Sequence, residues 1–207
     1  MTATDSSRAD PDADEAQVRR LADWDASRLS ALGDEHGTPL YVVDVDRVLA
    51  NLRRFRAAFP DASVRYAAKA NSSGAVLSGL AASDCGVEVA SPGELRRARA
   101  AGFDPGATLY TAVNPPDHEL DHLVEYWHDA PALTVTAGAV DTLDRLADRG
   151  FDGRLSLRVN PGVGAGHDEA VEIGADPQFG IPADRVRDAC RRAAERFDVV
   201  GIHAHVG

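Results

Sequence analysis

The sequence predicts an α/β fold, specifically a β/α barrel of the TIM type that is incomplete in this chain. Short apolar runs of strand character alternate with helical patterns from residue 63 onward, and this alternation implies right-handed crossovers and a parallel sheet. Unusual polar residues recur where those runs end, as in barrel enzymes. Because a closed barrel has eight units, we expect 63–207 to hold the first six units of a longer protein. A doubly wound sheet is the alternative architecture.

The individual elements follow from periodicity and from the residues that end helices. Ser91 with Glu94 forms a capping box, and Pro92 suits the first helical position. Gly102 and Gly150 stand where helix ends favour a left-handed residue. The expected strands lie near 64–68, 86–90, 107–111, 132–136, 154–159 and 198–205, and the expected helices span 74–82, 92–101, 117–127, 139–149 and 183–196.

Two further regions precede the repeating part of the chain. Residues 1–16 are acidic and without periodicity, which predicts a disordered tail. Residues 17–62 are expected to form a helix within Val18–Leu32, a strand at T-P-L-Y-V-V-D, and a second helix that Asp44 or Asp46 caps and Pro60 ends.

The composition excludes several classes of function. The formal net charge of -11 over 207 residues argues against nucleic acid or an anionic membrane as partner. The start of the chain lacks the features of a signal peptide, and no apolar run is long enough to span a bilayer. Two scattered cysteines, Cys85 and Cys190, agree with a reducing compartment, so we expect a cytoplasmic protein. The acidic, lysine-poor composition further indicates a halophilic source.

Lys69 is the single lysine among the 22 basic residues of the chain. It follows the apolar approach Tyr66, Ala67 and Ala68, at the end of a predicted strand. Lysine can lose its proton and form a Schiff base with a carbonyl, whereas arginine stays protonated. A solvated surface lysine is the alternative, but its retention in a chain that otherwise uses arginine favours a chemical role.

Other polar residues also stand at predicted strand ends. They alternate with apolar neighbours, so the polar side chains would face the barrel axis. The apolar side chains, Ile202 among them, would face the surrounding helices. Each has a structural alternative: Glu88 and Arg158 are open to a role as buried ion-pair partners. His203 and His205 share one strand face, but no further ligands complete a metal site there, so no metal is expected.

Four segments, taken in order, resemble the fold type III pyridoxal-phosphate enzymes, the alanine racemase-like barrels that include diaminopimelate and ornithine decarboxylases. Y-A-A-K-A-N is similar to the family's cofactor-lysine motif, and the resemblance implies that Lys69 binds pyridoxal 5'-phosphate. I-H-A-H-V-G is similar to the segment whose second histidine, here His205, stacks on the cofactor ring. V-E-V-A-S-P-G-E-L places Glu88 where the family more often has an aspartate near the lysine. R-V-N-P-G-V-G-A-G-H implies that Arg158 lies near the cofactor.

The resemblance also shows departures. In D-P-Q-F-G-I, Gln178 occupies a position that is usually lysine, so a contact requiring a cation is lost there. The family's phosphate-binding glycine loop, its partner for the pyridine nitrogen and its C-terminal β domain are not found in these residues. Gly162, Gly164 and Gly166 are not a dinucleotide fingerprint, because no helical pattern follows them; a mobile active-site loop is the better interpretation.

The resemblance implies an amino-acid substrate and a homodimer with a shared active site. V-N-P-G-V-G-A-G-H-D-E favours the diaminopimelate branch, and therefore decarboxylation of meso-diaminopimelate to lysine. The alternatives are an ornithine or arginine-type decarboxylase, an amino-acid racemase of the same fold, a regulatory homologue that binds the cofactor without catalysis, and a barrel with unrelated chemistry.

Overall fold

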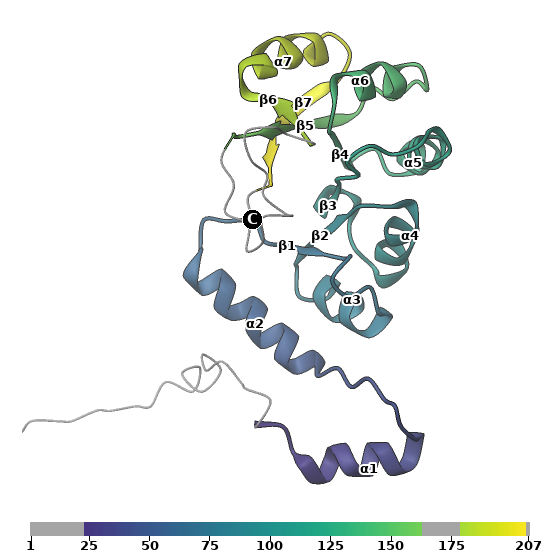
Figure 1. Ribbon diagram of the computed structural model, residues 1–207, viewed down its shortest axis with the longest axis vertical. Coiled ribbons are helices and arrows are strands. Elements are labelled where there is room, and N and C mark those ends of the chain that lie inside the picture. Colours follow the sequence, from purple (N-terminus) through teal and green to yellow (C-terminus); the bar gives the residue numbers. More distant parts are fainter. Residues whose placement is uncertain (1–22, 163–178, 206–207) are drawn as a thin grey trace, which may run out of the picture. The chain divides into compact units, whose positions relative to one another are not determined.

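The computed structural model describes residues 23–162 and 179–205 (Figure 1). The chain divides into two compact units, Met1–Ala62 and Ser63–Gly207, and each is described by itself. The predicted tail over 1–16 and the position of Gln178 lie outside the described residues. In the described part of the chain, no helix is both long enough and apolar enough to cross a membrane.

The second unit is a parallel sheet with helices on its outer side, which confirms the predicted fold class. Every strand pair in it is parallel, and strands β1 to β5 pair in chain order. Figure 1 shows these strands as a curved row with α3 to α7 on its outer side. The strands are β1 (Arg65–Ala67), β2 (Gly86–Val89), β3 (Thr108–Tyr110), β4 (Thr134–Ala137), β5 (Arg154–Asn160), β6 (Ile181–Pro182) and β7 (Asp198–Ala204).

The helices between these strands bury apolar faces and give the unit its core. They are α3 (Gly74–Ala81), α4 (Pro92–Ala101), α5 (Asp117–Asp129), α6 (Val140–Ala147) and α7 (Val186–Ala194), with 3₁₀ turns at Pro105–Ala107 and Ala183–Arg185. Leu77 of α3, Leu123 of α5 and Leu146 of α6 are fully buried. Each such side chain stabilises the fold by about 1.5–3 kcal/mol relative to an exposed one.

The predicted helix signals are confirmed. The Ser91 hydroxyl accepts a hydrogen bond from the Glu94 backbone N–H at 3.2 Å, and the Glu94 carboxylate accepts one from the Ala90 N–H at 2.8 Å. Gly102 has a φ of 96° and Gly150 a φ of 78°, a conformation that glycine adopts without steric cost. Ser91 and Glu94 thus fix where α4 begins. Gly102 marks the end of α4, and Gly150 marks the end of α6.

One strand of the unit was not predicted, and one residue is not covered as expected. β6 has only two residues, and it pairs with the end of β5 beside the β5–β7 ladder. Because β6 is too short to show alternation, it leaves no signal in the sequence.

Ile202 of β7 was expected to face a helix, but it is 68% exposed, because no helix within the described residues covers it.

The described residues of the first unit form two α-helices, and the strand predicted for this unit is wrong. α1 is Ala26–His36 and α2 is Val45–Ala58. The residues between Thr38 and Asp44 are described but form no strand. Tyr41 is 98% exposed. An extended segment becomes a strand only by pairing its backbone with a neighbour, and none of the described residues supplies that neighbour.

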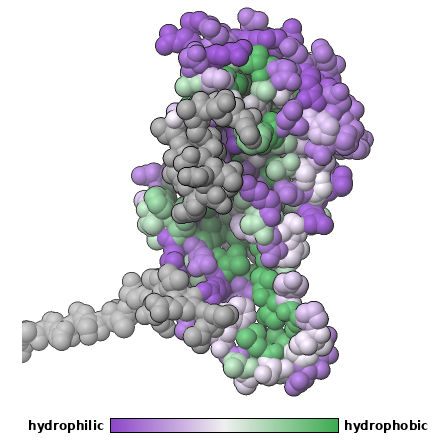
Figure 2. Space-filling view, in the orientation of Figure 1, coloured by the Kyte–Doolittle hydropathy of each residue, from purple (hydrophilic) through white to green (hydrophobic). Residues whose placement is uncertain are grey.

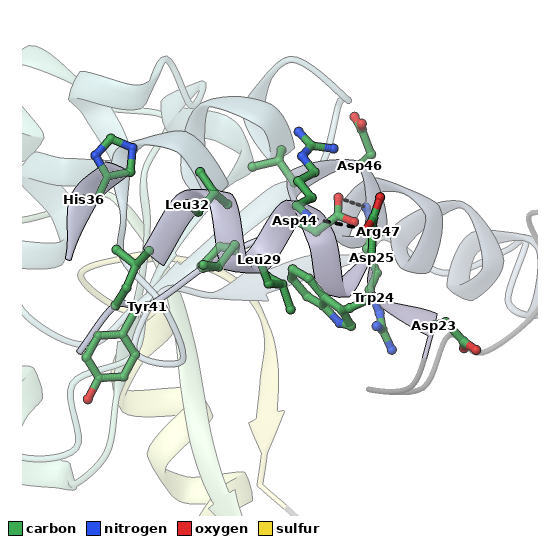
Figure 3. A pocket seen from close by; sticks show the side chains of 15 residues that line it. Asp23, Trp24, Asp25, Leu29, Leu32, His36, Tyr41, Asp44, Asp46 and Arg47 are labelled. Carbon is green, nitrogen blue, oxygen red and sulfur yellow. Dashed lines mark hydrogen bonds between the residues drawn. The ribbon is translucent and has the colours of Figure 1, made fainter. Parts of the chain in front are cut away.

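The helices of the first unit begin where aspartates cap them. The Asp25 carboxylate accepts hydrogen bonds from the N–H groups of Ser27 and Arg28, so α1 starts later than expected and runs past Leu32. Asp44 accepts from the Arg47 N–H at 3.1 Å, which confirms it as the cap of α2. A hollow of about 730 Å³ lies within this unit, and Trp24, Leu29, Leu32 and Tyr41 are among the residues that line it (Figure 3).

Candidate active site

Lys69 lies in a turn that directly follows β1. Ala67, the last residue of β1, pairs with Glu88 of β2, and the Ala68 N–H donates to the Glu88 carbonyl at 2.9 Å. A hydrogen bond from the Ala70 N–H to the Ala67 carbonyl, at 3.1 Å, closes the turn. Lys69 is exposed, and within the described residues its amine makes no hydrogen bond or ion pair. No group among the described residues therefore occupies the Lys69 amine.

Two hydrogen bonds brace the segment on either side of this lysine. The Tyr66 hydroxyl donates to the Asn71 carbonyl at 3.2 Å, and the Asn71 side chain accepts from the Ser73 N–H at 2.9 Å. Burial raises the pKa of the Tyr66 hydroxyl, which keeps its proton available for that bond. The strand and the start of α3 thus hold Lys69 from both sides.

Glu88 lies on β2 between two fully buried valines, Val87 and Val89. Alternation along the strand therefore directs Glu88 to the opposite face of the sheet from the helix-covered valines. One oxygen of its carboxylate, Oε1, accepts a hydrogen bond of 2.7 Å from the Thr111 hydroxyl. Thr111 follows β3 and is 5% exposed. The sequence did not single out this threonine, because a lone threonine after a strand carries no distinctive signal.

Arg158 lies on β5 and is only 9% exposed. Its guanidinium carbon is 5.7 Å from the centroid of the Phe179 ring, a cation–π distance. Burial lowers the pKa of the Arg158 guanidinium, and the nearby Glu88 carboxylate raises it. Asn160, at the end of the same strand, donates from its amide to the Phe179 carbonyl at 3.3 Å. The Arg158 guanidinium therefore lies against an aromatic face, and the charge of Glu88 acts on it from the same neighbourhood.

The two histidines differ in environment. His203 pairs with Arg158 across the β5–β7 ladder, and its Nδ1 is buried without a hydrogen-bond partner in the described part of the chain. Burial lowers the pKa of His203; Arg158 and His205 lower it further, and Glu88 raises it. His205 follows the end of β7 and is exposed. Spacing in the sequence did not show that His203 has a buried ring nitrogen whereas His205 is exposed.

The predicted site residues come from four strands or the residues just after them, at the carboxyl edge of the parallel sheet. Glu88, Arg158 and His203 influence one another electrostatically, which places their charges in one neighbourhood. Among the described residues, no group of His, Cys, Asp and Glu could hold a metal ion. A second hollow, of about 500 Å³, is lined by residues from Asn71 to Ala101, including Arg97, and none of the predicted site residues lines it.

Residues 45–207 match the family described as pyridoxal-dependent decarboxylase, pyridoxal binding domain. The chain belongs to this family. It is 39% identical, over 183 residues, to the diaminopimelate decarboxylase of Methanothermobacter thermautotrophicus, covering 85% of this chain and 42% of that protein. With the diaminopimelate decarboxylase of Vibrio cholerae it shares 34% identity over 196 residues, 86% of this chain and 44% of that protein. The chain thus spans less than half the length of these curated relatives.

Solved structures give the same grouping. The diaminopimelate decarboxylase of M. jannaschii in complex with L-lysine superposes with a TM-score of 0.73 at 25% identity, covering 86% of this chain and 44% of that one. The arginine decarboxylase of Paramecium bursaria Chlorella virus superposes with a TM-score of 0.71 at 20% identity, over 87% of this chain and 48% of that one. The second likeness shows the fold alone.

The residues present suit pyridoxal phosphate. The Lys69 amine is exposed and unpaired within the described residues, as bonding to the cofactor aldehyde requires. Arg158 offers a buried positive charge, and the exposed imidazole of His205 offers a flat ring. The buried, unpartnered Nδ1 of His203 leaves a polar atom that a bound molecule can satisfy. The donor set therefore combines an amine with groups for an anionic, aromatic cofactor.

Proposed function

We propose that this chain is the cofactor-binding part of a pyridoxal-phosphate-dependent decarboxylase that converts meso-diaminopimelate to L-lysine. The observation that carries the proposal is the exposed Lys69 in the turn after β1, in a chain that is 39% identical to a diaminopimelate decarboxylase. The L-lysine bound in the M. jannaschii structure is the product that this reaction forms, which supports the choice of substrate.

The site residues divide the work as follows. Lys69 would hold the cofactor through its side-chain amine. Glu88 would govern the proton on that amine. Arg158 holds negative charge next to the cofactor, and His205 supports one face of its ring. These roles are those that the family resemblance implies, and the burial of Arg158 and the exposure of Lys69 and His205 support them.

When bound, the cofactor supplies an electron sink for the pair released as carbon dioxide leaves. The protein's own contribution is orientation and exclusion of water. Its residues would orient the bond that breaks relative to the cofactor and would keep water away from the reacting carbon. The buried flank of Val87 and Val89 keeps the backbone that carries Glu88 in place during these steps.

The proposal extends to assembly and setting. We infer a cytoplasmic homodimer in which each subunit completes the other's active site, as the family resemblance implies, and a halophilic source. The net charge of -11 with a single lysine supports the last point, because concentrated salt screens the repulsion within an acidic surface. Unfolding followed from dilute buffer to molar potassium chloride tests it: stability that does not rise with salt contradicts a halophilic protein.

The deciding experiment uses the full-length protein with added pyridoxal phosphate and follows carbon dioxide release from meso-diaminopimelate in concentrated salt. Release that disappears in Lys69→Ala, together with the visible absorbance of the bound cofactor, establishes the function and the cofactor lysine. Visible absorbance retained in Lys69→Ala excludes this lysine as the cofactor residue.

Other outcomes separate the alternatives. Bound cofactor without release from meso-diaminopimelate directs the assay to ornithine, arginine and lysine, and then to racemisation of amino acids. Cofactor binding with no turnover of any of these substrates identifies a regulatory homologue. Each outcome keeps the family assignment and changes only the reaction.

A further inference from the structure

Thr111 is fixed against the strand that carries Glu88. Its backbone N–H donates to the Val89 carbonyl at 2.8 Å, so the β2–β3 ladder continues one residue beyond β3. Its side chain is 5% exposed, and in the described structure its hydroxyl has the Glu88 carboxylate as acceptor. A β-branched side chain in such a setting has few available rotamers. The hydroxyl is therefore a donor held in place by the sheet.

The hydrogen bond restricts a side chain that would otherwise be mobile. Glutamate has three side-chain torsions, and Glu88 is only partly buried, so packing alone does not select one rotamer. The 2.7 Å bond from Thr111 ends on Oε1. Within the described residues Oε2 accepts no hydrogen bond, which leaves that oxygen for a proton or a cation. One oxygen anchors the carboxylate, and the other remains available.

We propose that Thr111 is a positioning residue, which holds the Glu88 carboxylate in the orientation that serves the Lys69 amine. The inference rests on the proposed function, because it assumes that Glu88 governs the proton on Lys69. Thr111 itself touches neither cofactor nor substrate in this scheme. Its contribution passes entirely through Glu88, and this distinguishes it from a threonine that only stabilises the fold.

The test compares Thr111→Val, which keeps the shape and removes the hydroxyl, with Thr111→Ser, which keeps the hydroxyl. Both are made in the full-length enzyme, alone and together with Glu88→Gln. Thr142→Val is the matched control, since Thr142 is also a buried threonine, 2% exposed, and its hydroxyl has no partner among the described residues. The measurements are kcat, KM, and the visible spectrum of bound pyridoxal phosphate across pH.

We expect Thr111→Val to lower kcat about tenfold with KM changed less than about twofold, because orientation of a proton-transferring group is lost and binding is not. The pH midpoint of the spectral change should fall by about half a unit or more, since a carboxylate that is no longer held near the bound nitrogen stabilises its positive charge less. Thr111→Ser and Thr142→Val should match the wild type. In Glu88→Gln, adding Thr111→Val should change neither quantity further.

Three results overturn the inference: an unchanged kcat and spectrum in Thr111→Val, equal impairment in Thr111→Ser, or an undiminished effect of Thr111→Val in the Glu88→Gln background. If Thr111→Val does not fold, Thr111→Ala, which also removes the hydroxyl, takes the place of Thr111→Val in every comparison. If the wild type releases no carbon dioxide from meso-diaminopimelate, the substrate proposal fails, but the spectral comparison needs only bound cofactor and still decides the role of Thr111.

Discussion

Two groups of charged residues in the second unit differ in burial and in the partners that they have. On the outer side, Arg145 of α6 and Arg149 in the turn after it pair with Asp117 and Asp121 of α5 at 2.6–3.1 Å, with the aspartate side chains 64–70% exposed. Figure 2 shows mainly hydrophilic residues over α6 and α7. At the strand ends, Arg158 is 9% exposed. Water screens the first group and reaches little of Arg158.

The difference separates charges that ordinary ion pairing explains from a charge that burial opposes. Hydrogen bonding from Arg145, followed by its charge, lowers the pKa of Asp117, as expected of an ordinary ion pair. For Arg158 the leading cause is burial, which works against its charge. A protein retains a buried charge at such a cost most readily where a ligand or a reaction uses it. Changes to the two groups should therefore have effects of very different size.

The largest effect is expected from Lys69→Arg. This change keeps the positive charge and supplies the residue that the chain uses at its other basic positions, but a guanidinium does not form the bond to the cofactor. Activity of the full-length enzyme should fall by about a thousandfold or more, with loss of the visible absorbance of bound cofactor. Activity within tenfold of the wild type contradicts a covalent role for Lys69.

The next effect is expected from Arg158→Met, which fills similar volume without charge. The change leaves Glu88 without its nearby cation and His203 without its neighbour. We expect the affinity for pyridoxal phosphate to fall more than tenfold, and the free energy of unfolding to change by about 2 kcal/mol or less, because a methionine also relieves the burial of a charge. Equilibrium titration with the cofactor and urea unfolding measure the two effects. Unchanged cofactor affinity assigns Arg158 to the fold alone.

A smaller, pH-dependent effect is expected at His203. Because burial lowers its pKa in the folded protein, the unfolded chain binds more protons just below the ordinary value of 6.5. The stability associated with neutral His203 is thus present above that pH and is lost as the pH falls through the folded pKa. Between about pH 7.5 and about pH 5.5, urea unfolding should show a larger loss in the wild type than in His203→Gln. Equal losses argue against a buried, neutral histidine.

The smallest effect is expected from Arg192→Gln on the outer surface. Arg192 of α7 lies 2.6 Å from Asp144 of α6, and both side chains are nearly half exposed. Removing this pair should lower the free energy of unfolding by about 0.5 kcal/mol or less, with kcat and the cofactor spectrum unchanged. A change as large as that of Arg158→Met would remove the distinction between the two groups.

The sequence predicted the second unit far better than the first. From Ser63 onward, helix signals such as Ser91 and Gly102 act within a few residues, so local chemistry fixes the elements. The segment from Thr38 to Asp44 has the apolar, β-branched composition of a strand, yet it forms none in the described structure. Strand formation depends on a partner distant in the chain, and composition does not reveal whether that partner is present.

The sequence by itself determined the fold class and the family, because periodicity and short motifs are local properties of the chain. The chemical role of Lys69, inferred from a single retained lysine, stays a prediction. Only the tertiary structure decided that Thr111 bonds Glu88, that Arg158 lies over Phe179, and that Nδ1 of His203 is buried while His205 is exposed. These facts depend on which strands lie side by side and on how deeply each residue sits. Hydrogen bonding and burial are properties of neighbours in space, and a sequence orders neighbours only along the chain.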